Sequence, residues 1–189
     1  MTVVAPVAPA VVADRFTQWL DFAWRPDMDG QAYHSTAGDN GGPTEWGFTF
    51  STYTGWCVMH GLPYPTLADF KALSKASFVP LARALFWNAV QADHLPPGVG
   101  LLVCDFGFGS GPSTSVKQLQ TVLGFTGPAI DGALGPVTLG AVARTDRVKL
   151  VQALGARHAA FYRSLGTFHL FGNGWLRRNT DRVTVALAG

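Results

Sequence analysis

The spacing of apolar residues near the start of the chain predicts an amphipathic helix. Phe16, Leu20 and Ala23 recur at intervals of three and four residues, which places them on one helical face. Asp14 precedes them as a candidate N-cap, because its carboxylate can accept hydrogen bonds from free backbone N–H groups. Pro26 disfavours helical backbone at the residue before it, so we expect the helix to end there.

Periodic patterns predict further helices along the rest of the chain. Thr66 and Asp69 form a candidate capping box at the start of one helix, and Pro136 is well placed to open another. The run at 98–111 is apolar on nearly every side, which predicts a buried central helix. The expected helical segments are 66–73, 77–90, 98–111, 113–124, a short helix from Pro136, 146–165 and 172–187, of which 146–165 is the longest amphipathic one.

One segment breaks the helical pattern. Residues 45–56, EWGFTFSTYTGW, mix aromatic residues with threonines, which favours a short strand or hairpin. The predicted fold class is therefore mostly α, with one small β element between about residues 33 and 50. No Ser-, Pro- or Lys-rich tether interrupts the second half. We expect an N-terminal tail at 1–13, a first region at 14–111 and a helical subdomain at 112–189 that packs onto it.

Composition narrows the classes of partner. Hydrophobic residues make up 48% of the 189 residues and charged residues 14%, with a net charge of +2, which is too weak to indicate nucleic-acid binding. No uncharged apolar run reaches the roughly 18 residues that a membrane span requires. The first residues lack a basic start and contain prolines, so we expect no signal peptide. Cys57 and Cys104 lie in no metal-binding pattern, and we expect both to be buried.

The stretch from residue 24 to 49 is unusually acidic and glycine-rich for so apolar a chain. Asp27, Asp29, Asp39 and Glu45 all lie in it. Glycoside hydrolysis requires a carboxylic acid that protonates the leaving oxygen, together with a second polar group, and acids around a helix end and a hairpin would supply both. A solvated loop in which Asp and Gly serve turns is the alternative.

Aromatic and imidazole side chains of the same stretch also have two interpretations. Trp24 and Trp46 are able to stack on sugar rings, or to form part of the core or the wall of a pocket. His34 and Asp39 lack a third ligand at a familiar spacing, so we expect no metal site.

Several motifs resemble glycoside hydrolase family 108, the lysozyme-like muramidases found largely in phages and prophages. GDNGGPTEWGFT resembles the family's Asp-x-Gly-Gly-x-Thr-x-x-Gly-Ile-Thr signature, with Phe48 in place of Ile. ALFWNAV resembles its Tyr-Trp-Asp segment, and CDFGFGSGP resembles its Asp-Phe-x-x-Asn-x-Gly helix, with Gly109 in place of Asn. The segment VKQLQTVLGFTGPAIDGALGPVTLGAV resembles the peptidoglycan-binding segment that follows, and FYRSLGTFHLFGNGWLRR resembles the closing Phe-Tyr and Gly-Trp-x-x-Arg run. The residues at signature positions are Asp39, Gly41, Gly42, Thr44, Gly47 and Thr49.

The resemblance nominates site residues, with one departure. The family's catalytic Glu lies in a Glu-Gly-Gly tripeptide that this chain lacks. Counting from Phe16 places Asp27 at that position, whereas aligning DGQ with the tripeptide places Asp29 there. Thr44 is expected to hold a water or a sugar hydroxyl opposite the acid. The expected substrate-binding residues are Asp39, Glu45, Trp24, Tyr33 and Trp46.

The function that the resemblance implies is a muramidase. It would cleave the β-1,4 bond between N-acetylmuramic acid and N-acetylglucosamine without metal or cofactor, for host cell lysis. We expect a monomer whose partner is the peptidoglycan glycan strand, made in the cytoplasm and brought to the wall by a holin, a virion or a secretion machine. Two alternatives stay open: a catalytically impaired peptidoglycan-binding module, and a structural phage component with the same fold.

Overall fold

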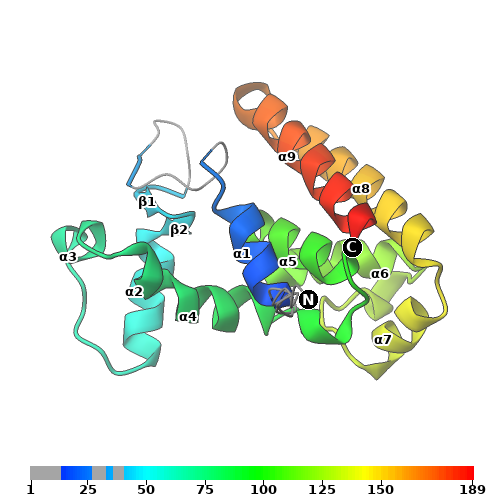
Figure 1. Ribbon diagram of the computed structural model, residues 1–189, viewed down its shortest axis with the longest axis horizontal. Coiled ribbons are helices and arrows are strands. Elements are labelled where there is room, and N and C mark those ends of the chain that lie inside the picture. The colour runs from blue at the N-terminus through cyan, green and yellow to red at the C-terminus, as the bar shows by residue number, and fades with distance from the viewer. Residues whose placement is uncertain (1–13, 27–32, 36–40) are drawn as a thin grey trace, which may run out of the picture.

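The computed structural model describes residues 14–26, 33–35 and 41–189. Its helices surround a central one and a small hairpin lies at one side (Figure 1). The α-helices are α1 (Arg15–Ala23), α2 (Phe50–Met59), α3 (Leu67–Lys71), α4 (Val79–Ala82), α5 (Val99–Ser110), α6 (Pro112–Val122), α7 (Pro136–Ala143), α8 (Arg147–Arg163) and α9 (Phe168–Ala188). Short 3-10 helices occupy Lys75–Phe78, Ala92–His94 and Gly127–Ala129, and a π-helical turn occupies Arg83–Trp87. The mostly α fold class is confirmed.

Local capping explains several helix starts. The Asp14 carboxylate accepts hydrogen bonds from the backbone N–H groups of Phe16 and Thr17, as expected. Thr66 and Asp69 form the expected capping box at α3. These side chains satisfy N–H groups that the first turn leaves without an intrahelical partner, and they fix where each helix begins.

The hairpin ends at Thr49, although the aromatic residues and threonines of 45–56 favoured strand structure beyond that point. Strands β1 (Thr44–Glu45) and β2 (Phe48–Thr49) are antiparallel, with Thr44 opposite Thr49 and Glu45 opposite Phe48. Trp46 and Gly47 form the connecting turn, both with positive φ, the backbone that a two-residue hairpin loop requires. From Phe50 onward the chain is helical, so the expectation of strand structure there was wrong: the Thr49 side chain accepts a hydrogen bond from the Thr52 N–H and starts α2.

Helix α5 is the centre of the fold. Its residues from Val99 to Gly107 are all buried, as the apolar run predicted. Helices α1, α6, α8 and α9 pack against it. Two glycines allow α9 to pack closely: a side chain at Gly98 would collide with the Ala186 backbone carbonyl, and one at Gly155 in α8 would collide with the Val183 side chain. Helix α9 is longer than α8, because it begins at Phe168 and not near residue 172, which corrects the expected order of lengths.

Aromatic side chains join the hairpin to the helical body. Phe48 of β2 contacts Phe78 and Phe108, with ring centroids 5.1 and 5.3 Å apart. Trp19 of α1 also contacts Phe108, with ring centroids 5.7 Å apart. The hairpin is therefore held against α5 by the main core. Across the described residues, no helix has the length and hydropathy to span a membrane.

Candidate active site

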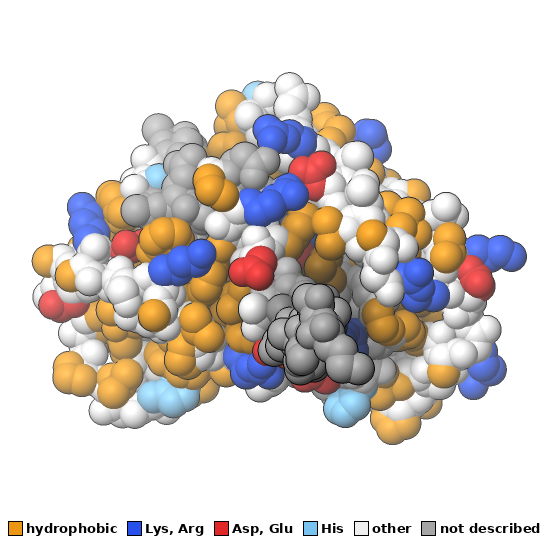
Figure 2. Space-filling model, in the orientation of Figure 1, with side chains coloured by type: hydrophobic (Ala, Val, Ile, Leu, Met, Phe, Trp, Pro, Cys, Tyr) orange, Lys and Arg blue, Asp and Glu red, His pale blue; other side chains and the backbone are white. Residues whose placement is uncertain are grey.

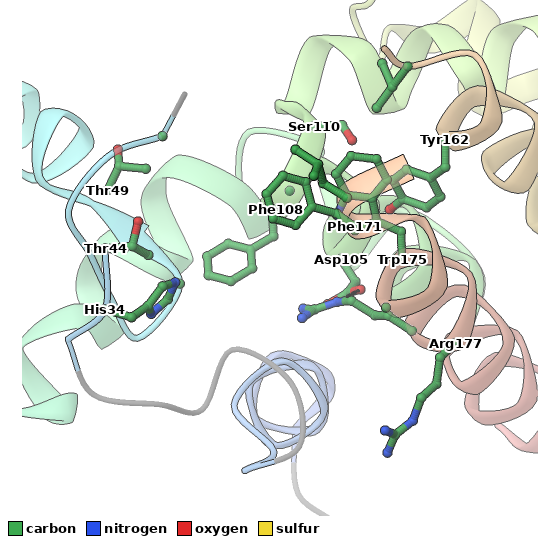
Figure 3. Close-up of a pocket in the computed structure, with 17 residues that line it drawn as sticks. His34, Thr44, Thr49, Asp105, Phe108, Ser110, Tyr162, Phe171, Trp175 and Arg177 are labelled. Atoms are coloured by element: carbon green, nitrogen blue, oxygen red, sulfur yellow. Dashed lines mark hydrogen bonds and ion pairs between the residues drawn. The ribbon is translucent and has the colours of Figure 1, made fainter. Parts of the chain in front are cut away.

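A cleft of about 690 Å³ lies between the hairpin and the tip of the α8–α9 pair. Figure 3 shows His34, Thr44 and Thr49 on one side, Tyr162, Phe171 and Trp175 on the other, with Phe108 and Asp105 between them. Over the molecular face drawn in Figure 2, Lys and Arg side chains are scattered among apolar and uncharged ones. The described lining residues are His34, Gly41, Thr44, Gly47, Thr49, Asp105, Phe108, Gly109, Ser110, Tyr162, Leu165, Leu170, Phe171, Gly174, Trp175, Arg177 and Arg178.

The hairpin wall is polar. Thr44 and His34 form an antiparallel bridge with N···O distances of 2.8 and 2.9 Å, which holds both side chains at the cleft. The Thr44 hydroxyl donates to the Gly42 carbonyl at 3.0 Å, and its oxygen keeps the capacity to accept a hydrogen bond. Thr49 lines the same wall while it caps α2. This wall offers hydroxyl and imidazole groups that suit a hydroxyl-rich ligand.

The base of the cleft is a buried ion cluster. Asp105 of α5 accepts a bidentate pair of hydrogen bonds from Arg178, at 2.7 and 3.0 Å, and a further one from Arg182 at 2.9 Å. Trp19 donates to the same carboxylate at 3.3 Å. Burial opposes ionisation, but the two guanidinium groups outweigh it and lower the pKa of Asp105 below its usual value. Asp105 therefore stays ionised and is unsuited to donate a proton to a leaving group.

The candidate residues of the hairpin region that the structure describes do not all lie in the cleft. Thr44 lines the cleft. Glu45 is not among the lining residues; its side chain is buried and burial raises its pKa. Trp24 is buried and donates through Nε1 to the Trp46 carbonyl at 2.9 Å, which ties α1 to the hairpin turn. The Tyr33 ring lies under the Lys71 ammonium, 4.0 Å from Nζ to the ring centroid.

The nominated aspartates lie outside the described residues. These are Asp27, Asp29 and Asp39. The described residues on either side of the segment that carries Asp27 and Asp29 have partners elsewhere in the fold. Arg25 forms an ion pair with Asp181 of α9 at 2.8 Å, and His34 is bridged to Thr44.

Sequence reasoning missed the opposite wall. Arg178 and Trp175 belong to the closing GWLRR motif but were not nominated as site residues, and Asp105 was read as part of a buried helix. A charged residue within an apolar run was the available signal for Asp105, because a buried carboxylate requires a partner. Among the described residues, no group of three His, Cys, Asp or Glu side chains is arranged to hold a metal ion.

Comparisons with known proteins identify the family of the chain. The family model described as Glycosyl hydrolase 108 matches residues 27–111, and one described as Predicted Peptidoglycan domain matches 114–180. The structure of Brucella abortus SagA is similar, with a TM-score of 0.81 and 34% sequence identity over 92% of this chain and 94% of that one. No curated protein matches. The similarity confirms the lysozyme-like fold class with its packed helical C-terminal part, and the chain belongs to glycosyl hydrolase family 108, as a glycosidase of the peptidoglycan-hydrolase kind.

Proposed function

We propose that this protein is a muramidase that cleaves the β-1,4 bond between N-acetylmuramic acid and N-acetylglucosamine, and that it acts on the cell wall during host cell lysis. The observation that carries the proposal is the composition of the cleft. Thr44, Gly47 and Thr49 of the hairpin signature line it together with Trp175 and Arg178 of the closing motif. Motifs more than a hundred residues apart thus meet at one site that is large enough for sugar rings.

Asp27 is the proposed general acid. Protonation of a leaving oxygen requires a carboxyl group that stays protonated near neutral pH. Counting from Phe16 places Asp27, which follows Pro26, at the position of the family's catalytic Glu, and this register supports Asp27 as the group that donates the proton. Asp105, the acid among the described lining residues, cannot take this role because its two guanidinium partners keep it ionised.

Thr44 is the proposed partner of the acid. Its hydroxyl lies on the wall of the cleft and can accept a hydrogen bond from a water or a sugar hydroxyl. Asp29 is the alternative acid, because DGQ aligns with the family's Glu-Gly-Gly tripeptide in a second register.

The test compares Asp27→Asn and Asp29→Asn on purified sacculi, with Asp21→Asn as control because Asp21 is an exposed acid of α1 outside the cleft lining. We expect Asp27→Asn to lower kcat by at least about 100-fold at an unchanged Tm, and the control to retain full activity. Mass spectrometry of the released fragments should find N-acetylmuramic acid at the new ends. Full activity in Asp27→Asn would refute its assignment, and loss in Asp29→Asn alone would transfer the role.

A peptidoglycan-binding protein without catalysis is the second candidate, because the chain lacks the Glu-Gly-Gly tripeptide. An inactive parent that binds insoluble peptidoglycan and gains lysis on Asp27→Glu would establish this candidate and still support the position of the acid.

A further inference from the structure

The two walls of the cleft differ in chemistry. The hairpin wall presents hydroxyl and imidazole groups from Thr44, Thr49 and His34. The opposite wall, on α8, α9 and their connection, presents the rings of Tyr162, Phe171 and Trp175 and the aliphatic side chains of Leu165 and Leu170, and Arg177 and Arg178 follow on α9. Figure 3 shows Phe171 and Trp175 facing the hairpin across the cleft. A ligand that lies between the hairpin and these rings therefore meets polar groups on one side and apolar ones on the other.

The apolar wall is separate from the main hydrophobic core. Tyr162 and Trp175 stack with ring centroids 5.4 Å apart, and Phe171 lies 5.6 Å from Trp175. Trp175 and Phe171 are only partly buried, Leu170 beside them is 55% exposed, and none of the three belongs to the core cluster. Partly exposed aromatic rings gathered at a concave site are typical of ligand binding, because stable packing would bury them fully.

Gly174 keeps the same wall open. It lies inside α9, where glycine weakens a helix, and a side chain built on it would meet nothing within 4 Å. Gly172, two residues earlier, differs because a side chain there would collide with Phe168. Packing therefore accounts for Gly172, whereas the absent side chain of Gly174 leaves space in the cleft.

We propose that Trp175 and Phe171 form a platform for the apolar face of a sugar ring of the glycan strand, whose hydroxyl edge lies against the hairpin wall. A pyranose ring has C–H groups on its face and hydroxyl groups at its rim, so it matches both walls of the cleft. The segment that matches the peptidoglycan domain then binds glycan inside the cleft, together with the hairpin, and not at a separate surface. This inference rests on the glycan substrate of the proposed function.

The experiment measures KM and kcat on sacculi, and the Kd for labelled glycan chains from which the peptide stems have been removed. Trp175→Ala should raise KM and Kd about tenfold, the equivalent of about 1.4 kcal/mol, and change kcat less than about twofold. Trp175→Phe should recover most of the affinity. Trp56→Ala is the matched control, because Trp56 is partly buried against His60 on α2, away from the cleft, and it should leave both constants unchanged.

A second variant tests the wall without removing a ring. Gly174→Leu should raise KM and Kd while Tm stays equal or rises, since leucine favours helix more than glycine. Gly140→Leu is the control, because Gly140 lies within α7 and outside the cleft lining; it should leave KM and Kd unchanged. If Trp175→Ala fails to fold, the KM and Kd of Gly174→Leu still test whether this wall of the cleft binds glycan.

Unchanged constants in folded Trp175→Ala and Gly174→Leu would overturn the platform. So would a loss confined to stem-bearing chains, because the rings would then contact the peptide. An inactive parent whose binding of stem-free glycan depends on Trp175 would refute hydrolysis and support the platform.

Discussion

Replacing Asp105 by Asn removes the negative charge at the base of the cleft. It tests how much the ion cluster that joins α5 to α9 contributes to stability. In Asp105→Asn the Arg182 guanidinium, whose side chain is 0% exposed, keeps its charge without a carboxylate partner. Breaking a buried pair in this way typically costs about 3–5 kcal/mol, a large part of the roughly 5–15 kcal/mol that stabilises a domain. Arg178 adds less to the loss because its side chain is 14% exposed and borders the cleft.

The assay is thermal unfolding at pH 7, with Asp181→Asn as the control. We expect Tm to fall by about 6–20 °C in Asp105→Asn, at roughly 2–4 °C per kcal/mol for a chain of this size. Asp181 pairs with Arg25 through side chains that are 35% and 33% exposed, so its loss should cost no more than about 1 kcal/mol.

The pH dependence follows from the lowered pKa of Asp105. Its contribution is present above the unfolded pKa of about 3.9 and is lost as the pH falls through the lower folded pKa. The difference between the wild type and Asp105→Asn should therefore be full at pH 7 and shrink below about pH 4. Equal Tm losses in Asp105→Asn and Asp181→Asn would refute the reasoning.

Three further predictions concern pH, the hairpin and the C-terminal part. Burial and two nearby arginines hold the pKa of His158 well below its usual value, so stability should fall by up to about 1.4 kcal/mol per pH unit below about pH 6.5. His158→Phe should flatten that part of the Tm–pH curve, and parallel curves would contradict this. Thr44→Ala should reduce lysis of sacculi, whereas Glu45→Gln should not, because Glu45 lies outside the cleft lining; the opposite result would reverse the assignment. Limited proteolysis should release no stable fragment cut near residue 112, because α6, α8 and α9 pack against α5.

The sequence by itself determined the elements whose signals are local. Asp14 and the Thr66–Asp69 pair marked helix starts, because a cap bonds to N–H groups only a few residues away. The continuous apolar run at 98–111 identified the buried α5, and apolar periodicity indicated the mostly α class, because both signals lie within short stretches of chain. Composition failed over 50–59, where aromatic residues and threonines favour strands on average but Thr49 caps a helix.

Only the tertiary structure decided the cleft. Asp105 meets Arg178 and Arg182 across more than 70 residues of chain, and Trp175 faces Thr44 across more than 130. Such pairs leave no periodic signal, since their contact depends on how α5, α9 and the hairpin pack. Motif resemblance pointed to Thr44 and to the closing run separately. Thr44 and the closing run lie on opposite walls of one cleft only because α9 packs closely on α5. No short stretch of sequence encodes that packing.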